Sequence, residues 1–431
     1  MKDCYKTKND LTTERKKNMK INPVKGTNDY LPEQTALRDR LQETILSVYR
    51  AAGYNRITTP ILEDIENLDK SEGGENLNLI FKVMKRGEKL ESALEKGDYK
   101  NLADMGLRYD LTLPLCRYYA ANRAHLPTPF KCIQTDRVYR AERPQKGRLR
   151  EFVQCDIDVL GDSGSDCEIE LIATTAKALL KVGFEGFTVK VNDRRVLRAV
   201  LTVCGFEEEK FDSVCISLDK LDKIGAEGVK KELLEKGCTE ESAAKLLTLF
   251  EEQVTLNRAL EFIGKECEAG VRLQGILESS LCLAKDRYNV VFDLTLIRGQ
   301  GYYTGTVFEV ALPGYPGAIA GGGRYDNLVG KFIGEQVPAV GFSIGFERIF
   351  GILQEQGMSV SLGGKKKLAI VYEGSFADAY EAAEGLREDY DCALYLKPKK
   401  VGKLLSNLEK SGFSGFAYAE NIGEIRFFEQ K

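Results

Sequence analysis

The sequence predicts an α+β fold that carries a helical insertion and ends in a small α/β domain. Strand-like runs are concentrated in two separate parts of the chain, at 107–160 and 290–324. Between these parts, residues 194–285 have a helical pattern that is rich in Glu and Lys. After residue 366, short strand and helix patterns alternate to the end of the sequence, which is typical of a small α/β domain.

The first predicted element is an amphipathic helix. Apolar residues recur at spacings of three and four between Arg38 and Ala52, and Gly53 follows in the position where glycine commonly ends a helix. The next segment, YNRITTPILE, alternates like a strand, and its Pro60 suits an edge or an interface. Residues 85–106 are charged and predict a surface hairpin or a helical excursion.

The later patterns predict most of the strands. Helices are expected at 167–182 and at FERIFGIL, which follows the strand-like GFSIG. The predicted strands are 107–113, 129–134, 137–142, 151–160, 187–192, 290–312 and 317–324.

Composition excludes several classes of protein. Of the 431 residues, 43% are hydrophobic and 29% are charged, so the chain can bury large cores and is not compositionally disordered. With a net charge of −3, the protein as a whole does not attract nucleic acids or anionic membranes. A polyanionic partner would therefore have to bind a local basic patch. No apolar stretch reaches the ~18 residues that a membrane-spanning helix needs. The 11 scattered cysteines, behind an N-terminus without a secretory signal, predict reduced thiols and a cytoplasmic location.

The single histidine, His125, narrows the possible chemistry. One histidine excludes His-rich zinc sites, HExxH proteases and relays between two histidines. Its polar context, NRAHLPTP, predicts a surface loop rather than a catalytic triad. An enzyme with this composition would use arginines, carboxylates and a polyphosphate substrate.

The densest group of polar side chains lies at 136–161, in DRVYRAERPQKGRLREFVQCDIDVLG. Two strand-like runs flank the loop RPQKGRLR. On the second run Gln154, Asp156 and Asp158 share one face, and apolar residues fill the other. Because arginine binds phosphate by a planar fork, the five arginines in this segment favour a site for a zwitterion and a nucleotide. A solvated hairpin with paired surface charges is the alternative.

This segment resembles motif 2 of the class II aminoacyl-tRNA synthetases, in the form of the histidyl-tRNA synthetase family, whose loop reads ERPQKGRxR. Three further segments agree. KGTNDYLP, with the helix, strand and Pro60 that follow, resembles the family N-terminus and motif 1. IRGQGYYTGTVFEV (297–310) resembles the histidine-specific signature. AGGGRYDNLV and GFSIGFERI (320–349) resemble the second signature and motif 3.

The resemblance implies how the chain is divided. The core would be the antiparallel sheet of a class II synthetase with its helices, and a homodimer would form through motif 1. The implied units are a disordered or non-native tail at 1–18 before Met19, the catalytic core at 19–193 and 286–355, the helical insertion at 194–285, a linker at 356–366, and a shortened anticodon-binding-like domain at 367–431.

The resemblance also implies a reaction. Histidine and ATP would form histidyl-adenylate, with Mg²⁺ on the phosphates, and the histidyl group would pass to the 3′ end of histidine tRNA. Arg140 would hold the α-phosphate, and Arg298 would bridge it to the carboxylate of histidine. Glu142 would lie near the adenine, and Arg348 would contact the γ-phosphate. It implies no metal site built from side chains, no DNA partner and no membrane contact.

Histidine itself would be held by side chains from four segments. Asp110 and Thr112 would take the α-amino group, and Asp158 with Tyr303 would face the imidazole. Gly321 to Gly323 would let the backbone approach the substrate. The implied histidine-binding set is Asp110, Thr112, Gln154, Asp158, Arg298, Tyr302, Tyr303 and Tyr325.

The implied tRNA contacts are basic. Arg148 and Arg150 would lie near the acceptor end, in the motif 2 loop. Lys399 and Lys400 belong to a second basic cluster at 397–403, which is either a solvated helix start or a phosphate contact.

Two other functions compete with the ligase. A histidine-sensing regulatory subunit of ATP phosphoribosyltransferase has the same core and charges no tRNA. The short C-terminal domain and the departure from the signature at Gln300 and Gly301 favour it, whereas Arg140, Arg298, Arg348 and the complete motif 2 loop oppose it. A class II synthetase for another amino acid is opposed by the YYTG and GGGRYD elements.

Overall fold

The structure is a computed structural model. It describes residues 21–70, 78–144, 148–218, 220–250, 254–296, 302–356 and 365–428. The predicted tail at 1–18, the residues Arg298, Gln300 and Gly301, and most of the predicted linker at 356–366 lie outside the described residues.

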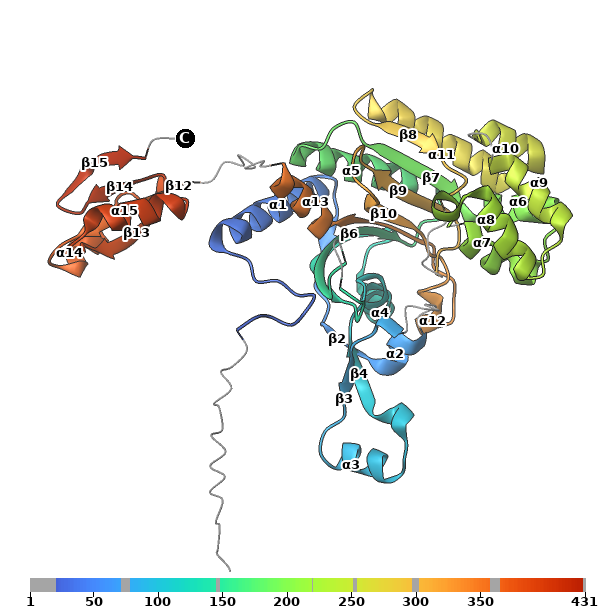
Figure 1. Cartoon of the computed structure of the whole chain (residues 1–431), viewed down its shortest axis with the longest axis horizontal. Helices are drawn as coiled ribbons and strands as arrows, with labels where there is room; N and C mark the ends of the chain where they lie inside the picture. Colours follow the sequence, from blue (N-terminus) through green and yellow to red (C-terminus); the bar gives the residue numbers. More distant parts are fainter. Residues whose placement is uncertain are drawn as a thin grey trace, which may run out of the picture.

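A large sheet forms the centre of the molecule (Figure 1). In order across the sheet, its strands are β1 (Asn55–Arg56), β5 (Phe130–Tyr139), β6 (Glu151–Leu160), β11 (Ala339–Gly345), β10 (Ala318–Arg324), β9 (Thr306–Ala311), β7 (Thr188–Asp193) and β8 (Asn289–Phe292). Neighbouring strands are antiparallel, except for the parallel pairs β1 with β5 and β7 with β8 at the two edges. This arrangement confirms the predicted α+β class with a mainly antiparallel core.

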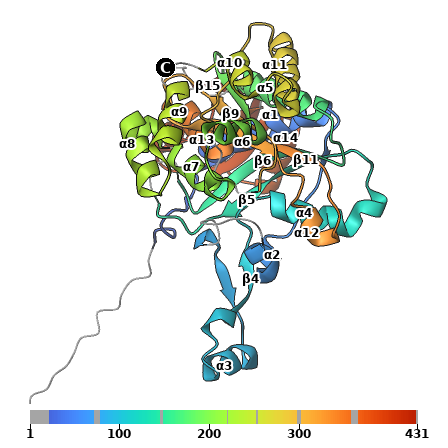
Figure 2. The same cartoon turned by 90° about the vertical axis from the view of Figure 1, so that its right-hand side faces the viewer.

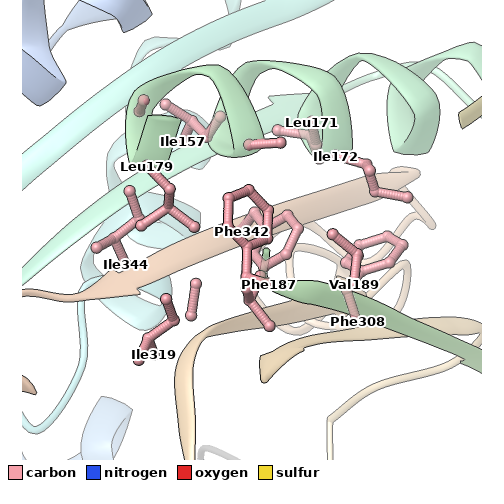
Figure 3. Close-up of a cluster of buried hydrophobic side chains, with 14 of the residues drawn as sticks. Ile157, Leu171, Ile172, Leu179, Phe187, Val189, Phe308, Ile319, Phe342 and Ile344 are labelled. Carbon is pink, nitrogen blue, oxygen red and sulfur yellow. The ribbon is translucent and has the colours of Figure 1, made fainter. Parts of the chain in front are cut away.

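One face of the sheet is covered by helices and forms the main hydrophobic core. On this face β6 contributes Cys155, Ile157 and Val159, all fully buried. Figure 3 shows part of the cluster, in which the rings of Phe308 and Phe342 stack with centroids 5.2 Å apart. Fully burying an apolar side chain of this size contributes roughly 1.5–3 kcal/mol. The covering helices are α1 (Pro32–Ala51), α5 (Asp166–Val182), α11 (Glu268–Ala284) and α13 (Phe346–Glu355).

A small sheet of β2 (Leu62–Asp64), β4 (Ala103–Leu107) and β3 (Lys82–Met84) projects from this body. β3 and β4 form an antiparallel hairpin, and both views show it reaching away from the large sheet (Figures 1 and 2). Helical segments lie between the two strands, as predicted for 85–106. The helices of this part of the molecule are α2 (Ile65–Lys70), α3 (Glu88–Glu95), η2 (Tyr99–Asn101), α4 (Thr112–Asn122), η3 (Arg123–His125) and α12 (Gly330–Ile333).

The predicted strand at 107–113 is wrong, because β4 ends at its first residue and α4 begins near its end. The chain leaves the strand at Arg108, whose buried guanidinium donates to the backbone carbonyl of Thr59 at 2.8 Å. Asp110 then accepts a hydrogen bond from the backbone N–H of Leu113 at 3.2 Å, inside the first turn of α4. The alternation of LRYDLTL therefore belongs to a turn and a helix start. These contacts are long-range or local to the turn, and a strand pattern cannot reveal them.

Two other predicted strands differ in extent. The runs at 129–134 and 137–142 merge into the single strand β5, which ends at Tyr139, three residues before the predicted end, and pairs with β6 along its whole length. The YNRITTPILE segment forms the short strands β1 and β2, and Pro60 lies between them.

Helices fill the segment between β7 and β8, as predicted. The first of them pack around their own hydrophobic cluster, which includes Leu197, Val214 and Leu246. The last helix, α11, instead packs on β7, β8 and α5, and so belongs to the main core. The helices before α11 are α6 (Arg194–Cys204), η4 (Glu208–Lys210), α7 (Phe211–Leu218), α8 (Leu221–Glu235), α9 (Glu240–Phe250) and α10 (Leu256–Ile263).

The C-terminal part alternates strands and helices around a separate sheet. The strand order is β13, β12, β14, β15, with β12 parallel to β13 and β14, and with β15 antiparallel to β14. Its elements are β12 (Lys366–Tyr372), α14 (Phe376–Glu384), β13 (Tyr390–Leu396), α15 (Val401–Lys410), β14 (Gly415–Tyr418) and β15 (Asn421–Phe427). No helix in the described ranges is both long enough and apolar enough to cross a membrane.

A buried ion network joins the large sheet to its covering helices. Glu168 of α5 is fully buried and accepts two hydrogen bonds from the guanidinium of Arg324 of β10, at 2.7 and 2.8 Å. Arg272 of α11 donates to the same carboxylate at 3.0 and 3.1 Å. Two arginines compensate one buried carboxylate here. Removal of its charge deprives Arg272 of this partner and leaves Arg324 with the longer ion pair to Asp326, at 3.3 Å.

Glu168→Gln is therefore expected to lower the free energy of unfolding by about 3–5 kcal/mol, as measured by denaturant titration. The control is Glu235→Gln, which removes an exposed ion pair with Lys231 within α8 and is expected to cost less than about 0.5 kcal/mol. Equal losses in the two variants would contradict the assigned role of the network.

Candidate active site

A cavity of about 1160 Å³ opens on the face of the large sheet that is turned away from the main core. Its floor is formed by β6, β10 and β11, and the segments around 110, 140 and 303 complete its walls. The predicted site residues that line it are Asp110, Thr112, Arg140, Glu142, Arg148, Gln154, Asp158, Tyr302, Tyr303, Tyr325 and Arg348. Segments separated by more than two hundred positions in the sequence therefore meet at one place.

The strand β6 supplies the acidic floor. Gln154, Asp156 and Asp158 alternate with core residues and all line the cavity. On the neighbouring strand β11, Gly341 lies opposite Asp158. A Cβ at Gly341 would lie 1.9 Å from Asp158 Oδ1, so the Asp158 side chain needs glycine at this position.

Asp158 is held by an aromatic cluster. The hydroxyl of Tyr325 donates a hydrogen bond to Asp158 Oδ1 at 2.6 Å. The Tyr325 ring packs edge-on against Tyr302, and Tyr302 packs likewise against Tyr303. Burial, with a smaller contribution from the charge of Asp110, raises the pKa of Asp158 to about 7, although the Tyr325 hydrogen bond favours the ionised form.

Asp110 and Thr112 lie across the cavity, at the start of α4. Burial raises the pKa of Asp110 to about 6, although the backbone N–H of Leu113 and the charge of Arg140 both favour its ionised form. The hydroxyl of Tyr302 lies 3.4 Å from Asp110 Oδ2 and 3.5 Å from Thr112 Oγ1. These contacts place the two side chains next to the aromatic cluster.

Arginines form the other part of the cavity wall. Arg140 donates through Nε to the carbonyl of Tyr109 at 3.0 Å, and its guanidinium lies 4.9 Å from the ring centre of Phe152. Arg348, in the first turn of α13, donates to the carbonyl of Ala318. The cavity thus combines buried carboxyls with cationic side chains, which suits a ligand pair of opposite charges.

The predicted glycines line the cavity, but two of them have a more specific reason. A Cβ at Gly322 would lie 2.0 Å from the carbonyl of Gly341 on the next strand. A Cβ at Gly323 would lie 2.7 Å from the carbonyl of Thr306 and 2.9 Å from the ring of Tyr303. Backbone contact between strands therefore excludes a larger residue at both positions, and the Tyr303 ring adds to this at Gly323.

Other predicted residues lie elsewhere. Arg150 is not on the cavity lining, and it donates to the carbonyl of Glu142 at 3.1 Å. Lys399 and Lys400 are exposed in the C-terminal part, just before α15. His125 is exposed in η3, as predicted.

Sequence reasoning assigned no role to two residues of the site. Asp156 has only 5% of its surface exposed, and its alternation with core residues was the available signal. The carboxylate of Glu347 accepts hydrogen bonds from both Nη groups of Arg38, at 2.6 and 2.7 Å, and so connects α13 to α1. The spacing of Arg38 and Glu347 in the sequence gives no sign of this ion pair.

A family model described as histidyl-tRNA synthetase matches residues 26–349. The chain belongs to the histidyl-tRNA synthetase family. The matched range contains every cavity residue named above, and the match confirms the resemblance in the motifs.

Other members of the histidyl-tRNA synthetase family match nearly the whole chain. A histidine–tRNA ligase of Leifsonia xyli is 39% identical over 422 residues, which cover 93% of this chain and 95% of that protein. A histidine–tRNA ligase of Christiangramia forsetii is 37% identical over 430 residues, which cover 94% and 93%. The crystal structure of histidyl-tRNA synthetase from Nostoc sp. PCC 7120 superposes with a TM-score of 0.77, at 26% identity and 94% and 93% coverage.

In this member of the histidyl-tRNA synthetase family, the raised pKa of Asp158 makes stability depend on pH. Between pH 4 and 7 the folded chain keeps a proton on Asp158 that the unfolded chain has lost, so stability falls as the pH rises through this range. Asp158→Asn is expected to remove this loss. The free energy of unfolding of the variant should exceed that of the parent by at most about 4 kcal/mol at pH 8, and the two values should be equal near pH 4.

Chemical denaturation at several pH values measures this difference. Asp39→Asn, which changes an exposed carboxyl on α1, is the control and should track the parent at every pH. A constant difference between Asp158→Asn and the parent across the pH range would contradict the prediction.

Proposed function

We propose that the protein is a histidine–tRNA ligase. Histidine and ATP react to give histidyl-adenylate and pyrophosphate. A hydroxyl at the 3′ end of histidine tRNA then takes the histidyl group, and AMP leaves. The main support is a single cavity that combines buried carboxyls with arginines, in a chain of the histidyl-tRNA synthetase family.

The first step needs cations, because both reactants are anions. A carboxylate oxygen of histidine attacks the α-phosphorus of ATP, and the bond to pyrophosphate breaks. Arg140 and Arg298 stabilise the negative charge that develops at the α-phosphate, and Arg348 holds the γ-phosphate. The fixed position of Arg140, against Tyr109 and Phe152, supports its role, since a preorganised cation needs little reorganisation during the reaction.

Histidine binds at the acidic end of the cavity. Its ammonium group lies between Asp110 and Thr112, and its imidazole N–H donates to Asp158 beside Tyr303 and Tyr325. An apolar side chain of similar size would leave the Asp158–Tyr325 pair without its partner, and such a site rejects the wrong ligand strongly. Gln154 and Tyr302 complete the binding set.

Mg²⁺ enters with the phosphates of ATP. Among the described residues no three His, Cys, Asp or Glu side chains converge as a metal site, which suits an ion that keeps several waters and binds mainly through substrate phosphates. The ion supplies charge neutralisation at the phosphates.

The tRNA contacts involve two basic regions. Arg148 lies at the rim of the cavity, 3.5 Å from Glu142, and this position supports a role for Arg148, together with Arg150, near the adenine and the acceptor end of tRNA. Lys399 and Lys400 provide a phosphate contact in the domain at 367–431. The division of the chain predicted from the sequence is part of this proposal, except that α11 packs with the core. We further propose a homodimer through the motif 1 segment.

The regulatory alternative has less support. A protein from Bacillus halodurans C, described as an ATP phosphoribosyltransferase regulatory subunit/histidyl-tRNA synthetase, has a TM-score of 0.75 at 22% identity and therefore shares the fold alone. The relatives with 37% and 39% identity are ligases by name and match the C-terminal part as well as the core.

Exchange of pyrophosphate into ATP tests the first step. The full chain is expected to catalyse this exchange when histidine is present. Arg298→Ala is expected to reduce it at least about a hundredfold while histidine binding stays measurable, because a positioned donor at the reacting centre is worth this much. Arg426→Ala, in the exposed part of β15, is the control. A folded parent without exchange would overturn the ligase function, and unchanged exchange in Arg298→Ala would overturn the role of that residue.

Charging of tRNA tests the basic cluster. The double variant Lys399→Ala/Lys400→Ala is expected to lower kcat/KM for tRNA by about tenfold and to weaken its salt dependence, since two phosphate contacts are lost. Pyrophosphate exchange should not change. Lys410→Ala, at the exposed end of α15, serves as the control. If the double variant charges tRNA like the parent, the lysines are a solvated helix start.

A further inference from the structure

Asp156 is a buried carboxyl in the active-site cavity that the proposed reaction leaves without a task. It lies on β6 between Gln154 and Asp158 and has 5% of its surface exposed. Within the part of the chain that the structure describes, Asp156 Oδ1 is fully buried and has no hydrogen-bond partner. The same holds for the neighbouring Gln154 Oε1. Two unpartnered acceptors therefore lie side by side on one strand face.

Packing does not explain an aspartate here. Where strands of this sheet approach closely below the cavity, the residues are glycines, namely Gly341 and Gly322. Close strand packing therefore does not require a carboxyl at position 156. Asp156 lies opposite Ser343 on β11 and Gln134 on β5, and these are small or polar residues rather than a core environment. A buried acceptor without a partner is costly, so a donor from a ligand is the simplest reason to keep it.

The position of Asp156 along β6 indicates which donor this is. Residues two apart on a strand are separated by roughly 7 Å, so Asp156 lies midway between Gln154 and Asp158. The proposed orientation of histidine places its imidazole at Asp158 and its carboxylate toward Arg140. The α-carbon and its ammonium group then lie over the middle of this stretch of β6, with Asp110 across the cavity.

We propose that Asp156 is a further substrate-binding residue, which receives the α-ammonium group of the amino acid on Oδ1 opposite Asp110. This assignment rests on the proposed function. The ammonium has three N–H donors, so it can donate to Asp156 Oδ1, Gln154 Oε1 and Asp110, while the neighbouring Thr112 Oγ1 keeps its contact with the Tyr302 hydroxyl at 3.5 Å.

The charges around Asp156 lead to a second consequence. The groups that face it are Asp158 and Gln154 on its own strand, Ser343 on β11, Arg140 after β5, and Asp110 before α4. Burial, with the charges of Asp158 and Asp110, raises the pKa of Asp156 well above its usual range, against the Ser343 hydrogen bond and the Arg140 charge. A cation bound beside Asp156 lowers this pKa again, so binding of the ammonium group is expected to be coupled to release of protons.

Two ligands separate the ammonium contact from other roles. Histidine and 3-(imidazol-4-yl)propionate share the imidazole and the carboxylate, but the second lacks the amino group. Calorimetry on the full chain measures the Kd of each ligand. For Asp156→Asn, the Kd of histidine is expected to rise by tenfold to a hundredfold, and the Kd of 3-(imidazol-4-yl)propionate is expected to change by less than threefold. In two buffers of different ionisation enthalpy, the parent should release a proton on binding histidine, and the variant should release less.

The matched control is Asp158→Asn, which alters the imidazole end and should weaken both ligands alike. Asp156→Ser provides a second variant with a shorter neutral side chain if Asp156→Asn does not fold. Equal effects of Asp156→Asn on the two ligands, or no effect on either, would overturn the assignment. Histidine-dependent exchange by the parent decides the proposed function separately, so failure of that function is distinguishable from failure of the role of Asp156.

Discussion

The alternation of side chains along β6 is the constraint on which the site depends. The strand lies between β5 and β11 inside the large sheet, so both of its edges are hydrogen-bonded and its two faces remain for side chains. One face must be apolar because helices α1, α5 and α13 pack on it. The other face is free for chemistry, and the sequence uses it for Gln154, Asp156 and Asp158. A shift of one residue would turn the carboxyls into the core and the apolar residues into the cavity, so the register that builds the core also builds the site.

The acidic floor is tolerable because neighbouring groups and ligands balance it. Three carboxyls in one cavity repel one another, and burial raises the pKa of each. Arg140 offsets part of this effect for Asp110 and Asp156. The ammonium group of a bound amino acid supplies the rest, whereas a ligand without a positive group does not. The negative charge of the three carboxyls, which is unfavourable without a ligand, thus favours binding of a substrate that carries an ammonium group.

Much of the site could be predicted from the sequence because its residues lie in short, ordered segments. Strand alternation showed which side of β6 is polar, and the motifs identified Asp110, Arg140, Tyr325 and Arg348 as partners, all of which line one cavity. The interpretation of 107–113 as a strand failed because the turn depends on the burial of Arg108 against Thr59, a long-range contact. The role of Asp156 was not predicted either, since alternation gives the face of a residue but not whether its oxygen has a partner.

Long-range ion pairs explain how separate segments keep one geometry. Glu347 precedes Arg348 and accepts from both Nη groups of Arg38, while the backbone N–H of Val153 donates to it at 3.2 Å. The Arg38 guanidinium also lies 4.0 Å from the ring centre of Tyr30. One carboxylate therefore joins α1, β6 and α13 directly beside a cation of the cavity. Because α13 can turn only if this pair breaks, the position of Arg348 relative to the floor of the cavity is set by a residue more than three hundred positions earlier in the chain.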